Sequence, residues 1–204
     1  MQYALRFDGL FRSFYGSSNS RDSAGFLCYG WLICRNDVVI AQGHGVFARS
    51  RDASSNVAEY LALIEGLDAL GDLGLEDQSV KVFGDAKSVI DQMIGIASVS
   101  SEAIWPLYMR ARQLSRRFIN LKWVWTPRKN NKAADWLTRR AMQQIRSDQR
   151  SYQAALKAAS NGSGNKRYPC KLLPIIDLRI FQPASFAGGM AGVFSPLPNL
   201  RISL

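Results

Sequence analysis

The stretch SSNVAEYLALIEGLDAL, from Ser54 to Leu70, predicts the helix around which the rest of the chain is arranged. Its apolar residues recur at helical spacing, so one face of the helix should pack into a core. Ser54, Ser55 or Asn56 can cap its start, because their side-chain oxygens accept hydrogen bonds from the free amides of a first turn. We expect Glu59 in that first turn, where a carboxylate also favours the positive end of the helix dipole.

The composition describes a soluble globular protein. With 204 residues, 47% hydrophobic and 21% charged, the chain can hold one domain with its own core and an appendage. No apolar run is long enough for a membrane span, and the start MQYALRFDG carries no signal-peptide pattern, so we expect no membrane partner and a cytoplasmic location. The three cysteines are too far apart in the expected fold for a disulfide framework or a zinc site.

Charge is distributed unevenly along the chain. Residues 1–109 carry 8 basic and 13 acidic side chains, a net charge of −5, whereas residues 110–150 carry 12 basic and 2 acidic side chains, a net charge of +10. An acidic front followed by a basic back is typical of a protein that holds a polyanion beside a carboxylate site. The alternative is a solvated helix face, which most runs of like charge form.

Runs of aromatic and β-branched residues predict five strands with helices between them. Their order implies an α/β domain with a mixed sheet, in which the first and fourth strands are parallel neighbours. The first strand should end at the Asp8-Gly9 pair before a loop from Leu10 to Ser23, and the last helix, capped by Asn130 or Asn131, should run to about Ala158. The expected strands are Tyr3 to Asp8, Ala24 to Cys34, Val38 to Phe47, Ser79 to Phe83 and Asn120 to Trp125, and the other expected helices are Lys87 to Ile94 and Glu102 to Arg117.

The end of the chain differs from the rest. We expect the domain to span residues 1–159, a linker (SNGSGNK) to span residues 160–166, and a Pro/Gly-rich C-terminal extension with five of the seven prolines to span residues 167–204. Leu172 to Phe181 could add an edge strand to the sheet. The apolar run from Phe186 to Leu200 either packs on the domain or meets a partner, which would be a second copy of the chain or another protein.

Four carboxylates should converge at one edge of this sheet. Asp8 and Asp85 each directly follow an apolar strand, and the carboxyl ends of the strands are where open α/β sheets place their sites. Glu59 and Asp135 fall in the first turns of helices that should pack on the same sheet. Carboxylates in one pocket repel each other, and a divalent cation with all-oxygen coordination, Mg²⁺ or Mn²⁺, removes that conflict.

The same acids lie in four blocks that resemble the motifs of type 1 ribonuclease H. The blocks match the family in order and spacing over Gln2 to Met142; they are FDG at Phe7 to Gly9, SSNVAEYLALIEGL at Ser54 to Leu67, VFGDAKSVI at Val82 to Ile90 and WTPRKNNKAADWLTRRA at Trp125 to Ala141. The resemblance implies the ribonuclease H-like fold, a five-stranded mixed sheet with helices on both sides. It also implies a metal-dependent endonuclease that cuts the RNA strand of RNA/DNA hybrids and leaves 5′-phosphate products.

By that resemblance, the catalytic residues are Asp8, Glu59, Asp85 and Asp135, and they bind two metal ions roughly 4 Å apart. Asp8 would bridge both ions, and Asp135 would hold the ion that activates the attacking water. Glu59 and Asp85 would hold the ion that stabilises the leaving 3′ oxygen. Such a pair neutralises the charge that builds on the phosphate during in-line displacement.

The resemblance also assigns four substrate contacts. Asn56 matches a position near the RNA 2′-hydroxyls and Ser54 a position that holds a DNA-strand phosphate, although either side chain could simply cap the helix. Lys87 would touch the minor groove or remain solvated. Many members carry a histidine in the loop before the last aspartate; here that loop has Arg128 and Lys129, so Arg128 is our candidate for the role of helping product to leave.

The sequence departs from the family in two further respects. Leu10 and a longer loop replace the serine and the tight loop that usually follow the first motif. The basic protrusion with which some members grip DNA has no clear match, although four arginines could replace it: Arg110, Arg112, Arg116 and Arg117. Trp105 could stack on a sugar or a base, although an aromatic residue at helical spacing more commonly belongs to the core.

The alternative function is a catalytically idle module of the same fold that binds nucleic acid or a protein partner. The presence of all four acids argues against this alternative, because binding alone does not need such a set. Glu65 and Asp91 have no strand end or helix start that would aim them at the shared pocket, and we leave them out of the site.

Overall fold

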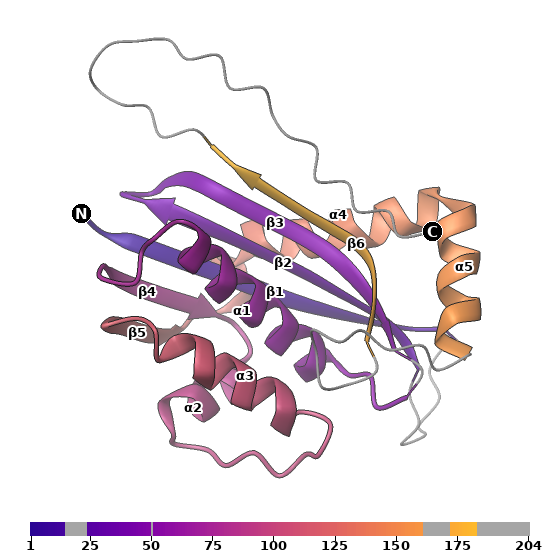
Figure 1. Ribbon diagram of the computed structural model, residues 1–204, viewed down its shortest axis with the longest axis horizontal. Coiled ribbons are helices and arrows are strands. Elements are labelled where there is room, and N and C mark those ends of the chain that lie inside the picture. The colour runs from indigo at the N-terminus through magenta and orange to yellow at the C-terminus, as the bar shows by residue number, and fades with distance from the viewer. Residues whose placement is uncertain (15–23, 50, 161–171, 183–204) are drawn as a thin grey trace.

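The computed structural model describes residues 1–14, 24–49, 51–160 and 172–182. A mixed sheet forms its centre, with the strand order β5-β4-β1-β2-β3-β6, and helices cover both faces (Figure 1). The strands are β1 (Tyr3–Ser13), β2 (Gly25–Arg35), β3 (Val38–Arg49), β4 (Ser79–Gly84), β5 (Asn120–Trp125) and β6 (Leu173–Phe181). The helices are α1 (Ser55–Asp72), α2 (Lys87–Ile94), α3 (Trp105–Ser115), α4 (Lys132–Ser147) and α5 (Gln149–Ser160), with a short 3₁₀ helix η1 (Arg128–Asn130).

Within the described residues the sheet has six strands, where the family resemblance implied five. β6 pairs antiparallel with β3, so the edge strand anticipated at Leu172 to Phe181 is confirmed. β1 lies parallel to β4 and antiparallel to β2, as the predicted crossover requires. The hairpin between β2 and β3 turns at Asn36 and Asp37, whose φ angles of 48° and 65° are the left-handed values that a two-residue hairpin turn demands.

β1 continues past the point where the sequence predicted its end. Asp8 and Gly9 both pair with β2, and the strand runs on to Ser13, so the prediction that the strand ends at this pair was wrong. The glycine serves another purpose, because a Cβ at Gly9 would lie 2.2 Å from the backbone nitrogen of Glu59. Its missing side chain lets α1 approach β1 closely, and this brings Glu59 to the strand that carries Asp8.

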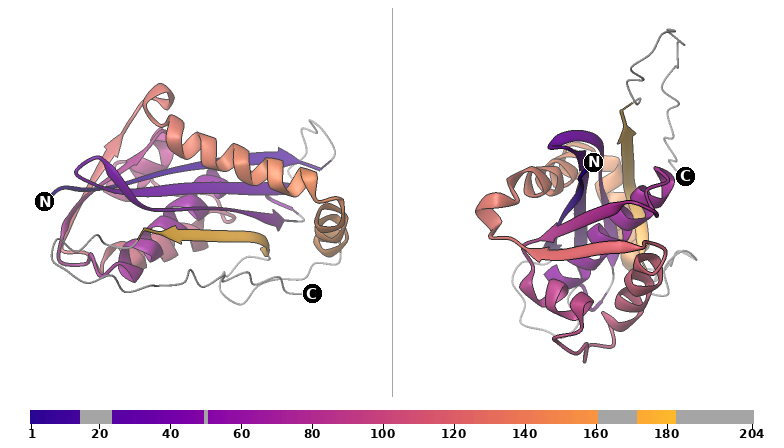
Figure 2. Two further views of the ribbon diagram at one scale, coloured as in Figure 1. Left: turned by 90° about the horizontal axis from the view of Figure 1, so that it is seen from above. Right: turned by 90° about the vertical axis from the view of Figure 1, so that its left-hand side faces the viewer.

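Separate apolar clusters bind helices to the two faces of the sheet. Side chains alternate along a strand, so Leu27 and Tyr29 of β2 belong to the cluster that packs on α1, whereas Phe26 and Cys28 belong to the cluster that packs on α4. Figure 2 shows α1 and α4 on opposite sides of the sheet. β2 is therefore buried on both faces, and the sheet forms a rigid platform between the helices.

The helix boundaries differ from the prediction in three places. Ser54 caps α1, with its hydroxyl oxygen 3.3 Å from the Val57 amide nitrogen, so Glu59 lies in the second turn and not in the first. The long last helix breaks at Asp148 into α4 and α5, because the Asp148 carboxylate accepts from the amides of Arg150 and Ser151, both at 3.1 Å, as a helix cap does. α3 is shorter at both ends than expected.

Charged groups as well as strand pairing hold β6 to the domain. Arg179 forms ion pairs with Glu65 and, at 2.9 Å, with Asp72, both on α1. Asp177 accepts a hydrogen bond of 2.7 Å from the hydroxyl of the buried Tyr29. The sheet therefore includes residues well beyond the expected domain end at residue 159.

Several expectations concern residues outside those described. They are most of the linker at residues 160–166, the apolar run from Phe186 to Leu200, residues 15–23 of the loop after β1, and Cys170. Within the described ranges, no helix combines the length and the hydropathy that crossing a membrane requires.

Candidate functional site

Three acids from three different elements meet at the carboxyl ends of the parallel strands. Asp8 lies within β1, Asp85 directly follows β4, and Glu59 comes from α1. The register of β1 and β4 places Asp8 beside Asp85. One ligand oxygen from each of the three carboxylates lies within 4.8 Å of the other two. The structure thus brings together three of the four acids that the sequence singled out.

Burial and mutual repulsion favour the protonated form of two of these acids. Burial raises the pKa of Asp8 to about 7, and the charges of Asp85 and Asp135 contribute to the increase. Burial also raises the pKa of Glu59 well above its ordinary value, and the charges of Asp8 and Asp85 add to that increase. Glu59 Oε2 is buried and has no hydrogen-bond partner in the described part of the chain. A cation bound here would stabilise the ionised forms of all three acids.

The donor set fits a hard divalent cation. The three ligands are all carboxylates, and oxygen ligands are those that Mg²⁺ and Mn²⁺ prefer. A cation would also give Glu59 Oε2 the partner that the described residues do not supply. Asp8, Glu59 and Asp85 are therefore the residues that could hold a metal.

Asp135 lies beside this group and is held by two arginines. α4 reaches the site because Gly30 of β2 has no side chain: a Cβ there would lie 2.8 Å from the Ala134 carbonyl oxygen. Arg139 Nε donates to Asp135 Oδ2 and Arg128 Nη2 donates to Oδ1, both at 2.7 Å. These hydrogen bonds, led by that from Arg139, lower the pKa of Asp135 below its ordinary value. Asp135 is therefore charged, but it is not one of the three acids within 4.8 Å of one another.

Two polar residues that orient the acids were missed as site residues. Asn131, expected only as a helix cap, is 1% exposed and donates from its amide nitrogen to the Phe7 carbonyl at 2.8 Å and to Asp85 Oδ1 at 3.2 Å. The Thr138 hydroxyl lies 3.2 Å from Asp8 Oδ2 and 2.8 Å from the Asp135 carbonyl oxygen. Their spacing could have revealed them, since residues four before and three after Asp135 share one helix face with it.

The four predicted substrate contacts already have partners within the chain. Ser54 caps α1, and Asn56 Oδ1 accepts a hydrogen bond of 3.3 Å from Ser88. Lys87 forms an ion pair of 2.5 Å with Asp91, one turn further along α2. The Arg128 side chain is 64% exposed while it contacts Asp135. A phosphate would therefore have to compete with a carboxylate for Lys87 and for Arg128.

Comparison with known proteins identifies the family. Residues 14–141 match a family model described as reverse transcriptase-like, a range that includes Glu59, Asp85 and Asp135. The Ribonuclease HI of Halobacterium salinarum is 31% identical over 129 residues, which are 63% of this chain and 62% of that protein. The chain belongs to the type 1 ribonuclease H family. A second member, Bifunctional protein Rv2228c of Mycobacterium tuberculosis, is 35% identical over 125 residues, which are 60% of this chain and 33% of that protein.

Two solved structures show the ribonuclease H fold in the same proteins. The crystal structure of the RNase H1 from Halobacterium salinarum superposes with a TM-score of 0.58 at 28% identity, over 71% of this chain and 99% of that one. The N-terminal RNase H domain of Rv2228c, solved as a fusion with maltose-binding protein, gives a TM-score of 0.57 at 31% identity, over 78% of this chain and 98% of that one. The chain spans only about a third of the length of the mycobacterial relatives.

Proposed function

We propose that this ribonuclease H family member is a metal-dependent endoribonuclease that cuts the RNA strand of RNA/DNA hybrids and leaves 5′-phosphate ends. The observation that carries the proposal is the convergence of Asp8, Glu59 and Asp85, whose oxygens lie within 4.8 Å of one another. Asp8 and Glu59 are also buried. Burying acids that repel each other destabilises the folded protein. A module that only binds nucleic acid does not need such a cluster, whereas a metal-dependent enzyme does. The name of the similar Ribonuclease HI agrees with this function.

We infer that the cofactors are two Mg²⁺ or Mn²⁺ ions. Asp8 would contribute to both ions, Asp135 to one of them, and Glu59 and Asp85 to the other. When bound, the ions would supply a nucleophilic water at neutral pH and neutralise the charge that develops on the phosphate. Their binding would also ionise Asp8 and Glu59, because a nearby positive charge lowers the pKa of a carboxyl.

Other residues of the chain would keep the acids in place and exchange partners with the substrate. Asn131 and Thr138 hold Asp85 and Asp8 by hydrogen bonds, so these two carboxylates are positioned before substrate arrives. Arg128 contacts Asp135 from an exposed position. A phosphate is an alternative acceptor for the Arg128 guanidinium. Arg128 would therefore exchange its hydrogen bond to Asp135 for one to the 5′-phosphate of the product, and this exchange would help the product to leave.

The predicted hybrid contacts lie at the starts of two helices. Ser54 and Asn56 are at the start of α1, and Lys87 is the first residue of α2. Helix starts present free amides and the positive end of the helix dipole, both of which favour phosphate. Asn56 would donate from its amide nitrogen to a 2′-hydroxyl, since its oxygen already accepts from Ser88.

Cleavage of a labelled RNA/DNA hybrid tests the proposal. The parent chain and Asp85→Asn would be assayed with Mg²⁺ or Mn²⁺, with duplex DNA and duplex RNA as substrate controls. We expect the parent to cut only the RNA strand of the hybrid, to leave 5′-phosphates detectable by mass spectrometry, and to lose this activity in Asp85→Asn. Asp91→Asn is the matched control, because it neutralises an aspartate nearby on α2 that pairs with Lys87 and lies outside the acid group.

Hybrid binding without cutting in either metal would favour the idle module instead. Equal loss of cutting in Asp91→Asn and Asp85→Asn would contradict the assignment of the acids. We also propose that the folded domain continues to residue 182, because β6 pairs with β3. The cytoplasmic location and a partner for the residues beyond 182 stay predictions from the sequence.

A further inference from the structure

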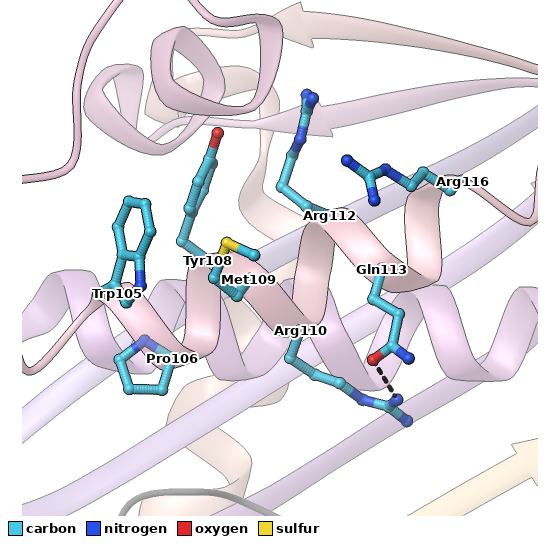
Figure 3. Close-up of a pocket in the computed structure, with 8 residues that line it drawn as sticks. All are labelled: Trp105, Pro106, Tyr108, Met109, Arg110, Arg112, Gln113 and Arg116. Atoms are coloured by element: carbon cyan, nitrogen blue, oxygen red, sulfur yellow. Dashed lines mark hydrogen bonds between the residues drawn. The ribbon is translucent and has the colours of Figure 1, made fainter.

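The surface of α3 carries a hollow of about 910 Å³, and the residues that line it all belong to this helix and its C-cap residue, Arg116. Figure 3 shows Trp105 and Tyr108 at one end of the hollow and Arg112 and Arg116 at the other. Trp105 is 50% exposed, so of the two interpretations of this residue the core position is excluded. Met109, between the two ends, is 47% exposed. The hollow thus combines exposed apolar surface with guanidinium groups along a single helix.

The cations of this surface are partly fixed and partly available. Arg112 Nη1 donates to the Met93 carbonyl at the end of α2, at 3.1 Å, so its guanidinium is held beside the hollow. Arg110 contacts Gln113 at 3.2 Å and Asp68 at 3.6 Å. The guanidinium of Arg116 has no hydrogen-bond acceptor or acidic partner within the described ranges. Arg112 and Arg116 together make this end attractive to a phosphate chain.

The aromatic end suits a single strand better than a duplex. The Trp105 ring lies 5.7 Å from the Tyr108 ring and keeps half of its surface open to solvent. In a duplex the bases are stacked on one another and cannot reach an indole, whereas the bases of a single strand can stack on it. Exposed aromatic rings beside cationic groups are the combination with which proteins hold single strands.

The length of the surface also fits a short single strand. From Trp105 to Arg116 the helix rises roughly 16 Å, at 1.5 Å per residue. A stacked strand that rises 3.4 Å per nucleotide would cover that distance with about five nucleotides. Single-strand sites of single domains begin at about four nucleotides, so the hollow is long enough for such a site.

We propose that the Trp105–Arg116 surface of α3 binds a single-stranded nucleic-acid segment that flanks the hybrid. Its aromatic end lies next to the helix that carries Glu59, because the Tyr108 ring contacts the ring of Tyr60 at a centroid distance of 6.4 Å. Tyr60 directly follows Glu59 in α1. A strand that leaves a hybrid held at the acids would therefore meet Trp105 first and the arginines next. The placement of the hybrid rests on the proposed function, whereas the affinity of the surface for a single strand does not.

Fluorescence anisotropy with the full chain in a metal chelator tests the proposal without cleavage. The probes are a blunt RNA/DNA hybrid, the same hybrid with a single-stranded flank of DNA or of RNA, and the same hybrid with an abasic flank that keeps the phosphates and lacks the bases. We expect a flank of about five nucleotides to tighten binding by about tenfold, since stacking of one base is worth about that factor. The abasic flank should give a much smaller gain, and the comparison of DNA with RNA flanks identifies which strand is held.

Variants of α3 separate stacking from charge. Trp105→Ala should abolish most of the gain from the flank and leave the affinity for blunt hybrid unchanged, while Trp105→Phe should keep part of the gain. Arg116→Ala should reduce the gain and lower the salt slope by about 1, as expected for one lost phosphate contact. Arg150→Ala removes the same charge from the exposed surface of α5 and should change neither quantity.

Three results would overturn the proposal: no gain from any flank, an equal gain from the abasic flank, or equal weakening of blunt and flanked hybrids by Trp105→Ala. Failure of the proposed function is a separate result. A protein that gains affinity from the flank but does not cut the hybrid with Mg²⁺ would retain the single-strand site and lose the assigned activity. A protein that cuts the blunt hybrid but gains nothing from the flank would do the reverse.

Discussion

Arg179 of β6 forms an ion pair with Glu65, which is 1% exposed and lies on α1, the helix that carries Glu59. The two residues are 114 positions apart in sequence. The strand that follows the expected linker therefore neutralises a carboxylate inside the helix that forms part of the acid site. This relationship links the stability of the site to residues outside the four motif blocks.

Arg179→Ala should lower the free energy of unfolding by about 3–5 kcal/mol, because removing one partner of a buried ion pair leaves an uncompensated charge. Urea denaturation followed by circular dichroism measures the change. Arg117→Ala is the matched control, since it breaks the more exposed pair with Glu76 and should cost about 1 kcal/mol or less. Equal losses in the two variants would show that the pair with Glu65 contributes no more to the free energy of unfolding than the exposed pair does.

Asn131→Ala should reduce the rate of hybrid cleavage and destabilise the fold by about 1–3 kcal/mol, because the Phe7 carbonyl and Asp85 both lose a donor. Asn130→Ala is the control, since Asn130 contacts Arg6 through its backbone oxygen, which the substitution keeps. Cleavage kinetics and the Mg²⁺ concentration for half-maximal activity would be measured for both variants. A loss of stability with unchanged kinetics would reduce Asn131 to a structural residue.

The metal-free protein should lose stability through Asp8 as the pH rises from about 4 to about 7. In this window the folded protein keeps a proton on Asp8, with its pKa of about 7, while the unfolded chain, with a pKa near 3.8, has released it. Stability falls with pH wherever the folded state binds more protons. Asp8→Asn lacks this titration and should be more stable than the parent above pH 7 by a few kcal/mol, at about 1.4 kcal/mol per pKa unit.

Urea unfolding in a chelator across this pH range, compared between the parent and Asp8→Asn, measures the difference. The difference should be small near pH 4 and grow toward neutral pH. Mg²⁺ should stabilise the parent more than Asp8→Asn at neutral pH, since the bound cation offsets the repulsion among the acids. Parallel stability curves for the two proteins would contradict the raised pKa of Asp8.

Ser54→Ala and Ser54→Asn separate the capping role of Ser54 from its predicted phosphate contact. The alanine variant removes the acceptor for the Val57 amide and should cost about 1 kcal/mol of stability. The asparagine variant can still cap the helix and should restore stability. If Ser54 also holds a DNA-strand phosphate, the asparagine variant should still show a raised KM for the hybrid; a KM equal to that of the parent would leave capping as its whole role.

The sheet order and the acid group could be predicted because their signals are local. The β2–β3 hairpin follows from two apolar runs around Asn36 and Asp37, and both residues adopt the conformation that such a turn needs. Asp8 and Asp85 could be predicted as neighbours because each comes directly after an apolar run, and the two runs form the parallel strands β1 and β4. Glu59 and Asp135 were placed beside these two aspartates as acids near the starts of helices that should pack on the same sheet, and the motif blocks contain the same four residues.

The remaining features depend on contacts between distant parts of the chain. Gly9 was interpreted as the end of a strand, although it is there because the backbone of Glu59 passes so close. Glu65 was left out of the site because no strand end or helix start directs it toward the pocket. Its pairing with Arg179 could not be predicted, because Arg179 lies in a segment with no motif. Trp105 has the helical spacing of a core residue, and only the packing of its neighbours leaves it half exposed. None of these relationships has a signature within a short window of sequence.

The position of β6 also has a consequence for synthesis on the ribosome. β3 ends at Arg49 and its outer partner begins at Leu173, so β3 emerges long before the strand that covers it. At about 5–20 residues per second, translation of the intervening residues takes roughly 6–25 s. During that interval the nascent chain exposes an unpaired strand edge, the kind of surface that pairs with other chains. Until the last strand arrives, β3 is therefore the edge at which the nascent chain can pair with another chain.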